Sequence, residues 1–106
     1  MNTDTIITTA LRTIELETNA VSGLKASIDA GFSKAVVQIA NSKGRLIVSG
    51  IGKSAIVAQK IVATLNSTGT PSVFMHAADA IHGDLGMIQS NDVVMGISKS
   101  GNSPEI

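Results

Sequence analysis

Three short apolar runs, each followed by a turn rich in glycine or polar residues, constrain this chain most strongly. They are Leu46 to Val48, Ser72 to Met75 and Asp92 to Ile97. Apolar runs of this length without alternation are typical of strands that are buried on both faces of a parallel sheet. A helical pattern over 53–66 lies between the first two runs, and a single helical turn is predicted over 76–81. The sequence therefore predicts a doubly wound, parallel α/β fold.

The helix predicted over 53–66 is expected to connect the first strand to the second. Its apolar spacing indicates that Ile56, Ile61 and Leu65 turn toward the sheet. Gly69 is placed to end the helix, because glycine adopts the left-handed conformation that is common after helix C-termini.

The turns after the three predicted strands span residues 49–54, 76–84 and 98–103. In a parallel sheet the carboxyl ends of the strands lie at one edge, and ligands of such folds bind beyond that edge. The three turns are therefore expected to converge on one ligand site.

Residues 1–44 have a different pattern and are predicted to form a helical segment before a domain that begins at residue 45. Apolar residues fall near one face of a helix over 4–25, and Phe32, Val36 and Ile39 mark a shorter second helix. Neither helix carries a catalytic cluster. Both are interpreted as packing or dimerisation helices.

Composition excludes several classes of function. Eight basic side chains balance eight acidic ones among the 106 residues, so nothing attracts nucleic acid or an anionic membrane electrostatically. The chain has no cysteine, which excludes disulfides and thiolate metal sites. No window approaches the roughly 20 apolar residues that a membrane helix needs, and the N-terminus lacks the pattern of a signal peptide. A soluble, cytoplasmic protein without nucleic-acid or membrane partners is expected.

The turn GIGKSA after the first strand raises the question of a phosphate site. It fails as a nucleotide-binding P-loop, whose first glycine would stand at Ile47, and as a dinucleotide fingerprint, because no acidic residue ends the second strand. What remains is a glycine turn, formed by Gly50 and Gly52, that lets the backbone approach a ligand closely. Lys53 and Ser54 then open a helix, whose free amides favour an anion. An anion site and a plain tight turn both stay open.

The third turn, within ISKSGNSPE, has the composition of a phosphate cradle. Hydroxyl groups together with helix N-terminal amides bind phosphate, although an ordinary turn has the same composition. The candidate phosphate-binding residues here are Ser98, Ser100, Gly101, Asn102 and Ser103.

The second turn, within FMHAADAIHGDLGM, contains both histidines of the chain, His76 and His82, together with Asp79 and Asp84. Three interpretations are open for it. The four side chains are of types that ligate a metal. The histidines are suited to acid–base chemistry near neutral pH. His82 and Asp84 are also suited to a structural role, in which they cap a turn.

The last residues, Ser103, Pro104 and Glu105, have the pattern of a helix start: a capping serine, proline at the first helical position and an acid in the first turn. A sheet of three strands would also leave an edge exposed. The chain is therefore predicted to be about the first half of an α/β domain.

In combination, these motifs are highly specific. GIGKSAIVAQKIVATLNSTGTPSVFMHAADAIHGDLGM followed by DVVMGISKSGNSPEI resembles the arabinose 5-phosphate isomerase family, whose core is the sugar isomerase (SIS) domain, in unbroken register over residues 45–106. The resemblance implies a flavodoxin- or Rossmann-like sheet of five parallel strands, a dimer or tetramer, and no metal or organic cofactor. It also implies interconversion of D-arabinose 5-phosphate and D-ribulose 5-phosphate, for synthesis of 3-deoxy-D-manno-octulosonate (Kdo) in lipopolysaccharide or capsule.

The resemblance also implies roles for single residues. Lys53, His82 and Glu105 match the family's active-site lysine, histidine and glutamate, and its phosphate loop falls on residues 98–103. Isomerisation moves a proton between C1 and C2 through an enediolate, which needs a base and a group that stabilises the oxyanion. Glu105 and His82 are both candidates for the base, and Lys53 or a donating His82 for the oxyanion.

Two departures from the family pattern stand out. The family usually has H-P-x-E-A where this chain has HAADA, so the turn lacks a proline and Asp79 is one methylene shorter than glutamate. The second half of the domain is expected to be missing, so these 106 residues alone are expected to be inactive. A non-catalytic SIS module that binds a sugar phosphate as a regulatory signal is the chief rival interpretation, and a metal-binding protein is the third.

Overall fold

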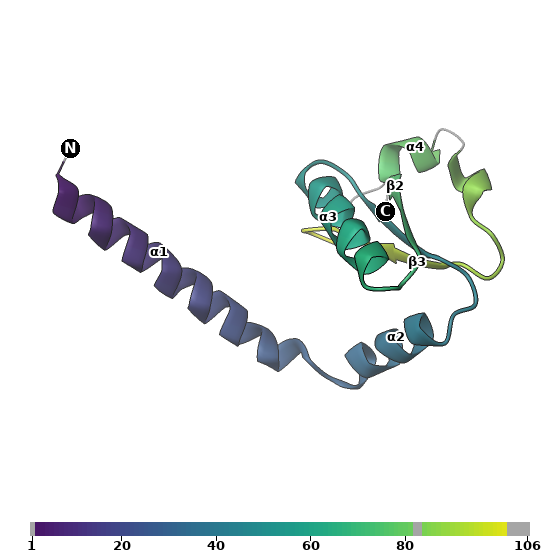
Figure 1. Ribbon diagram of the computed structural model, residues 1–106, viewed down its shortest axis with the longest axis horizontal. Helices are drawn as coiled ribbons and strands as arrows, with labels where there is room; N and C mark the ends of the chain where they lie inside the picture. Colours follow the sequence, from purple (N-terminus) through teal and green to yellow (C-terminus); the bar gives the residue numbers. More distant parts are fainter. Residues whose placement is uncertain (1, 82–83, 102–106) are drawn as a thin grey trace. The chain divides into compact units, whose positions relative to one another are not determined.

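Figure 1 shows the chain as a computed structural model, which describes residues 2–81 and 84–101. The chain forms two compact units, Met1–Val37 and Gln38–Ile106. Within the described ranges, no helix is both long and apolar enough to cross a membrane.

The first unit is helical. It contains α1 (Thr3–Gly23), a short 3-10 helix η1 (Leu24–Ser27) and most of α2 (Ala30–Ala40). The side chain of Asn2 accepts the backbone N–H of Asp4 at 2.8 Å, so α1 begins with an asparagine cap and an acidic residue in its first turn. Both helices predicted for this part of the chain are therefore present.

The second unit contains a parallel sheet of three strands in the order β2-β1-β3. The strands are β1 (Leu46–Gly50), β2 (Ser72–His76) and β3 (Val93–Gly96). β1 is the central strand and every one of its residues is buried, as its continuous apolar sequence requires. The predicted strands and their parallel arrangement are confirmed.

Helical segments make both connections between the strands (Figure 1). The helix α3 (Lys53–Ser67) joins β1 to β2. The short helix α4 (Ala77–Ile81) and the 3-10 helix η2 (Asp84–Met87) belong to the connection from β2 to β3.

The core lies in two clusters on opposite faces of the sheet. Successive residues of a strand point to opposite faces, so Leu46 and Val48 pack with Ala58 of α3. Ile47 instead packs with Ala80 of α4. Helical segments therefore cover both faces of the sheet, and the predicted doubly wound fold is confirmed.

The side of α3 that faces the sheet differs in part from the prediction. Ile61 and Leu65 pack against the core as expected, but Ile56 is 66% exposed, so its predicted inward position is wrong. Ala55 and Ala58 are the buried residues of this helix. Because alanine is small, these positions let the helix backbone approach the sheet closely. The prediction from the spacing of large apolar residues did not include them.

An ion pair ties the amino ends of β1 and β3 together. The Nη2 atom of Arg45 donates to Oδ2 of Asp92 at 2.8 Å, and the backbone N–H of Arg45 donates to Oδ1 at 2.8 Å. The backbone N–H of Gln89 donates to the same carboxylate, and Nη2 of Arg45 also donates to the carbonyl of Met87. These donors hold the pKa of Asp92 far below its usual range.

Candidate functional site

The carboxyl ends of the three strands lie at one edge of the sheet. Gly50 at the end of β1 pairs with His76 at the end of β2, and Ser49 pairs with Gly96 at the end of β3. The three turns singled out in the sequence therefore start at the same edge.

The strand order places a topological switch point between β1 and β3. The chain goes from β1 to β2 on one side and returns to β3 on the other side of β1. In open α/β sheets, ligands bind in the crevice beyond the carboxyl ends at such a point. The turns that follow the two strands at this switch point are GIGKSA after β1 and SKSG after β3.

Both glycines of GIGKSA have a physical reason in the structure. A Cβ atom at Gly50 would lie 2.9 Å from the carbonyl carbon and oxygen of Ser54, so the turn packs directly on the start of α3. Gly52 has φ 62° and ψ −131°, a backbone conformation that residues other than glycine rarely adopt.

The start of α3 is electropositive. Gly52 offers no side-chain cap, and the first turn of α3 contains no acidic residue. Lys53 is the first helical residue and is exposed, and Ser54 beside it is half-buried. A cation at a helix N-terminus works against the helix dipole and adds to the positive potential there. This arrangement suits an anion.

The turn after β3 stays beside β1. The backbone N–H of Ile97 donates to the carbonyl of Ser49 at 2.9 Å, so the pairing continues one residue past β3. The backbone N–H of Gly101 donates to Oγ of Ser98 at 3.0 Å, and Gly101 has φ 75°. Ser100 is exposed. Three predicted members of this turn and its helix start, Asn102, Ser103 and Glu105, lie outside the described residues.

The turn after β2 contains the remaining candidates. His76 is half-buried, and its Nδ1 atom accepts the backbone N–H of Ala78 at 3.1 Å. Asp79 is exposed in the first turn of α4, and Asp84 begins η2. His82 lies outside the described residues. From the sequence, His82 and Asp84 were candidates for capping a turn. The cap made by His76 was missed, because this contact depends on where β2 ends.

The metal interpretation of this turn gains no support from the described part of the chain. No three histidine, cysteine, aspartate or glutamate side chains gather there in a way that could hold an ion.

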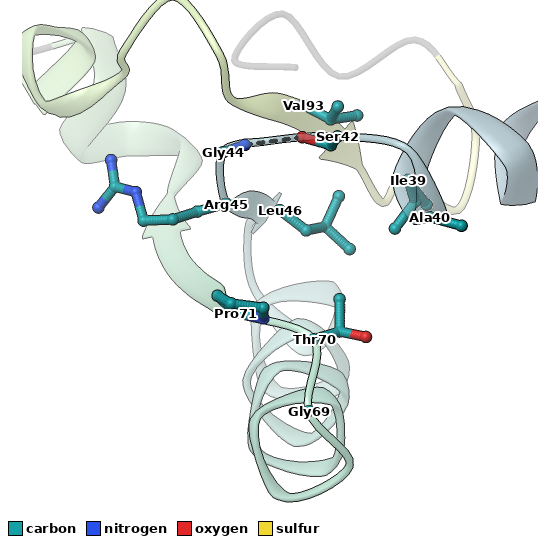
Figure 2. A pocket seen from close by; sticks show the side chains of 10 residues that line it. All are labelled: Ile39, Ala40, Ser42, Gly44, Arg45, Leu46, Gly69, Thr70, Pro71 and Val93. Carbon is teal, nitrogen blue, oxygen red and sulfur yellow. Dashed lines mark hydrogen bonds between the residues drawn. The ribbon is translucent and has the colours of Figure 1, made fainter.

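A cavity of about 220 Å³ lies at the amino edge of the sheet, opposite the three turns (Figure 2). Its lining includes Ser42, Gly44 and Arg45 before β1, and Thr70 and Pro71 before β2. Among the residues that the structure describes, none predicted for the ligand site lines this cavity. The candidate site therefore remains at the carboxyl edge.

Comparison with known proteins shows the family of this chain. The model of the SIS domain matches residues 38–106. The arabinose 5-phosphate isomerase KdsD of Pseudomonas aeruginosa is 53% identical over 100 residues, which are 94% of this chain and 31% of that protein. The arabinose 5-phosphate isomerase GutQ of Shigella flexneri is 45% identical over 103 residues, with 97% of this chain and 32% of that protein covered.

A solved structure agrees with these relatives. The protein c3406 of E. coli CFT073, in complex with arabinose 5-phosphate, superposes with a TM-score of 0.91 at 39% identity. The match covers 99% of this chain and 56% of that chain. This chain thus spans about a third of the length of the curated relatives named above. The chain belongs to the SIS domain family.

Proposed function

We propose that the full-length protein is an aldose–ketose isomerase that interconverts D-arabinose 5-phosphate and D-ribulose 5-phosphate. The observation that carries the proposal is the pair of turns, GIGKSA and SKSG, at the switch point between β1 and β3. This arrangement occurs in a chain that is 53% identical to a protein named arabinose 5-phosphate isomerase. An electropositive helix start beside a hydroxyl-rich turn is the chemistry that a sugar phosphate needs.

The phosphate group is anchored by the turn over residues 98–103, together with Gly50, Gly52 and Ser54. Binding energy from the phosphate, which does not react, holds C1 and C2 in place for proton transfer. Lys53 stabilises the negative charge that develops on the enediolate oxygen.

The proton moves in two steps that balance. A base removes the proton from C2 of the aldose, the electron pair forms the C1–C2 double bond, and the π pair of the C1 carbonyl moves onto its oxygen to give the enediolate. The same proton, or one exchanged with water, is then delivered to C1, while the proton of the C2 hydroxyl passes to the C1 oxygen, so that C2 becomes the ketone and C1 carries the hydroxyl. Glu105 and His82 are the two candidates for the base, and a positioned base contributes about 10²–10⁴-fold.

The wider setting of the proposal rests on its substrate and on the resemblance to the isomerase family. Charged phosphate esters do not cross a lipid bilayer unaided, so the reaction is placed in the cytoplasm. The product enters Kdo synthesis for lipopolysaccharide or capsule. The protein works as a homo-oligomer, a dimer or a tetramer, with a sugar phosphate as its ligand.

Turnover of matched substrates tests the proposal on the full-length protein. Formation of D-ribulose 5-phosphate from D-arabinose 5-phosphate is followed, with D-arabinose lacking the phosphate as the control. We expect kcat/KM for the free sugar to be lower by at least about 100-fold, because the phosphate supplies the anchoring energy. Absence of turnover with D-arabinose 5-phosphate would refute the enzyme.

Calorimetry with the same compound distinguishes the isomerase from its rival, a regulatory module that only binds the sugar phosphate. Binding of D-arabinose 5-phosphate without turnover would identify a regulatory SIS module instead of an isomerase. Binding together with turnover supports the enzyme.

A further inference from the structure

His76 occupies the position directly before α4 and caps that helix. Its Nδ1 atom accepts the backbone N–H of Ala78, the second residue of the helix, at 3.1 Å. A backbone amide always donates, so Nδ1 carries no proton, and the proton of the neutral ring lies on Nε2. Serine, aspartate or asparagine usually makes this kind of contact at a helix start.

The helix α4 depends on such a contact because it has only five residues. Helices this short are unstable on their own, since forming the first turn costs more than its single hydrogen bond returns. Ala77 and Ala80 are buried, at 0% and 7% exposure, and hold one side of the helix against the core. Asp79 in the first turn complements the helix dipole. The bond to Nδ1 satisfies one of the amides that the helix start leaves unpaired.

The ring of His76 is held at a second point. Phe74, two residues earlier on the same face of β2, meets it edge to face, with the ring centroids 6.2 Å apart and the planes at 85°. His76 also pairs in the sheet with Gly50, the first residue of GIGKSA. The cap therefore lies at the carboxyl edge, next to the turn that presents Lys53.

We propose that His76 is a positioning residue for the isomerase site and acts through α4 without contacting the substrate. It sets where the chain leaves β2 and the direction in which α4 runs. The helix α4 ends at Ile81, immediately before His82 in the sequence. A displacement of the helix start would therefore also displace a residue proposed for proton transfer. A displacement of about 1 Å at such a group can lower turnover by about 10²-fold. The inference rests on the proposed function.

Three substitutions in the full-length protein test this role. His76→Asn places an amide oxygen about where Nδ1 lies, and asparagine is a good helix cap. His76→Gln reaches instead to the position of Nε2, and His76→Ala removes both nitrogens. The measurements are kcat and KM for D-arabinose 5-phosphate, and hydrogen exchange of the Ala78 amide.

We expect His76→Ala to lower kcat by at least about tenfold with a much smaller change in KM, because geometry rather than binding is lost. His76→Asn should restore kcat to within about threefold of the wild type. His76→Gln should behave like His76→Ala. Exchange of the Ala78 amide should be fast in the alanine and glutamine variants and slow in the asparagine variant.

Three results would overturn the inference. If glutamine restores kcat and asparagine does not, Nε2 acts directly on the substrate. If asparagine slows exchange at Ala78 but all three variants keep wild-type kcat, the cap has only a structural role. If asparagine leaves Ala78 exchanging as fast as in the alanine variant, the cap itself is wrong. A wild-type protein without turnover would instead reject the isomerase, while the exchange rates would still decide whether His76 caps α4.

Discussion

At the scale of single residues, the turn GIGKSA combines two glycines that serve the fold with an exposed lysine at an unfavourable end of a helix. Gly50 is required by the close approach of Ser54, and Gly52 by its positive φ. Lys53 is exposed and stands at the end of the helix dipole where a cation is least favourable. An exposed residue whose position works against the helix dipole is a functional candidate.

Removal of the Lys53 charge tests its proposed role. We expect Lys53→Ala in the full-length protein to lower kcat for D-arabinose 5-phosphate by at least about tenfold, because the enediolate oxygen loses its stabilising charge. Lys60→Ala is the matched control, since Lys60 is exposed further along the same helix. Near-normal kcat in Lys53→Ala, or an equal loss in Lys60→Ala, would contradict the role.

Gly52→Ala tests the conformation of the turn. We expect it to lower the free energy of unfolding by about 1–3 kcal/mol, because alanine at φ 62° is strained even though there is room for the added Cβ. Gly23→Ala is the control: Gly23 has φ −62° and nothing near its added Cβ, so stability should be unchanged or slightly higher. Far-UV circular dichroism during urea denaturation measures both. Equal stability of the two variants would argue against the strain.

At the scale of elements, the two edges of the sheet carry different kinds of residues. The carboxyl edge carries the turns of the candidate site, whereas the amino edge is fastened by Arg45 and Asp92. Asp92 accepts from Arg45 and from the backbone of Gln89, so it also holds the chain between η2 and β3. The ion pair therefore joins the starts of β1 and β3 at the edge opposite the candidate site.

The Asp92 carboxylate makes this fastening sensitive to acid. Its pKa is lowered in the folded state, chiefly by the hydrogen bond from Arg45, so its contribution to stability is present above the unfolded value of about 3.9. The contribution is lost as the pH falls below that value. We expect Asp92→Asn to lower the Tm clearly at pH 7, and the difference from the wild type to shrink at pH 3.

Glu15→Gln on α1 is the control for this comparison, because it also replaces an acid by its amide but at an exposed position outside the unit that contains the sheet. Its Tm difference should be small at both pH values. A difference between Asp92→Asn and the wild type that stays constant from pH 7 to pH 3 would contradict the linkage.

Much of this element pattern could be predicted from the sequence, because continuous apolar runs and glycine turns are local signals. Both β1 and α3 are present where they were expected. The inward face of α3 was predicted only in part, since Ala55 and Ala58 approach the sheet where Ile56 was expected. The 3-10 helix η2 was not predicted from the sequence. Its end is held by a hydrogen bond from Arg45, 42 residues away along the chain, and local patterns do not contain such a contact.

The candidate site was predictable as a location more than as a set of contacts. The order of apolar runs implied that the three turns share an edge, and the strand order bears this out. The bond from Ala78 to His76 could not be read from residue types, because it depends on β2 ending at His76. The positions of His82, Asn102, Ser103 and Glu105 relative to Lys53 stay predictions.

At the scale of the whole molecule, α1 has a surface suited to another helix. Ile7, Leu11, Ile14, Thr18 and Val21 follow one another in alternate steps of four and three residues, the spacing of a coiled-coil seam. No residue of α1 is buried. A second copy of the chain is the partner that the proposed homo-oligomer supplies for this stripe.

Charges placed in the stripe test the oligomer. We expect the double substitution Leu11→Glu and Ile14→Glu to lower the mass of the full-length protein measured by light scattering, because like charges would then face each other across the seam. Arg12→Glu, which changes a charge outside the stripe, should leave the mass unchanged. An unchanged mass in the double variant would exclude α1 as the interface.

The most direct test of the central claim is the reaction itself, followed by NMR with D-arabinose 5-phosphate and the full-length protein in D₂O. Isomerisation through an enediolate predicts signals of D-ribulose 5-phosphate, with deuterium at C1 in the fraction of molecules whose transferred proton was exchanged with solvent on the base. An aldose that stays unchanged would contradict the proposed isomerase activity, whereas a ketose without deuterium at C1 would show that the C2 hydrogen is transferred without exchange.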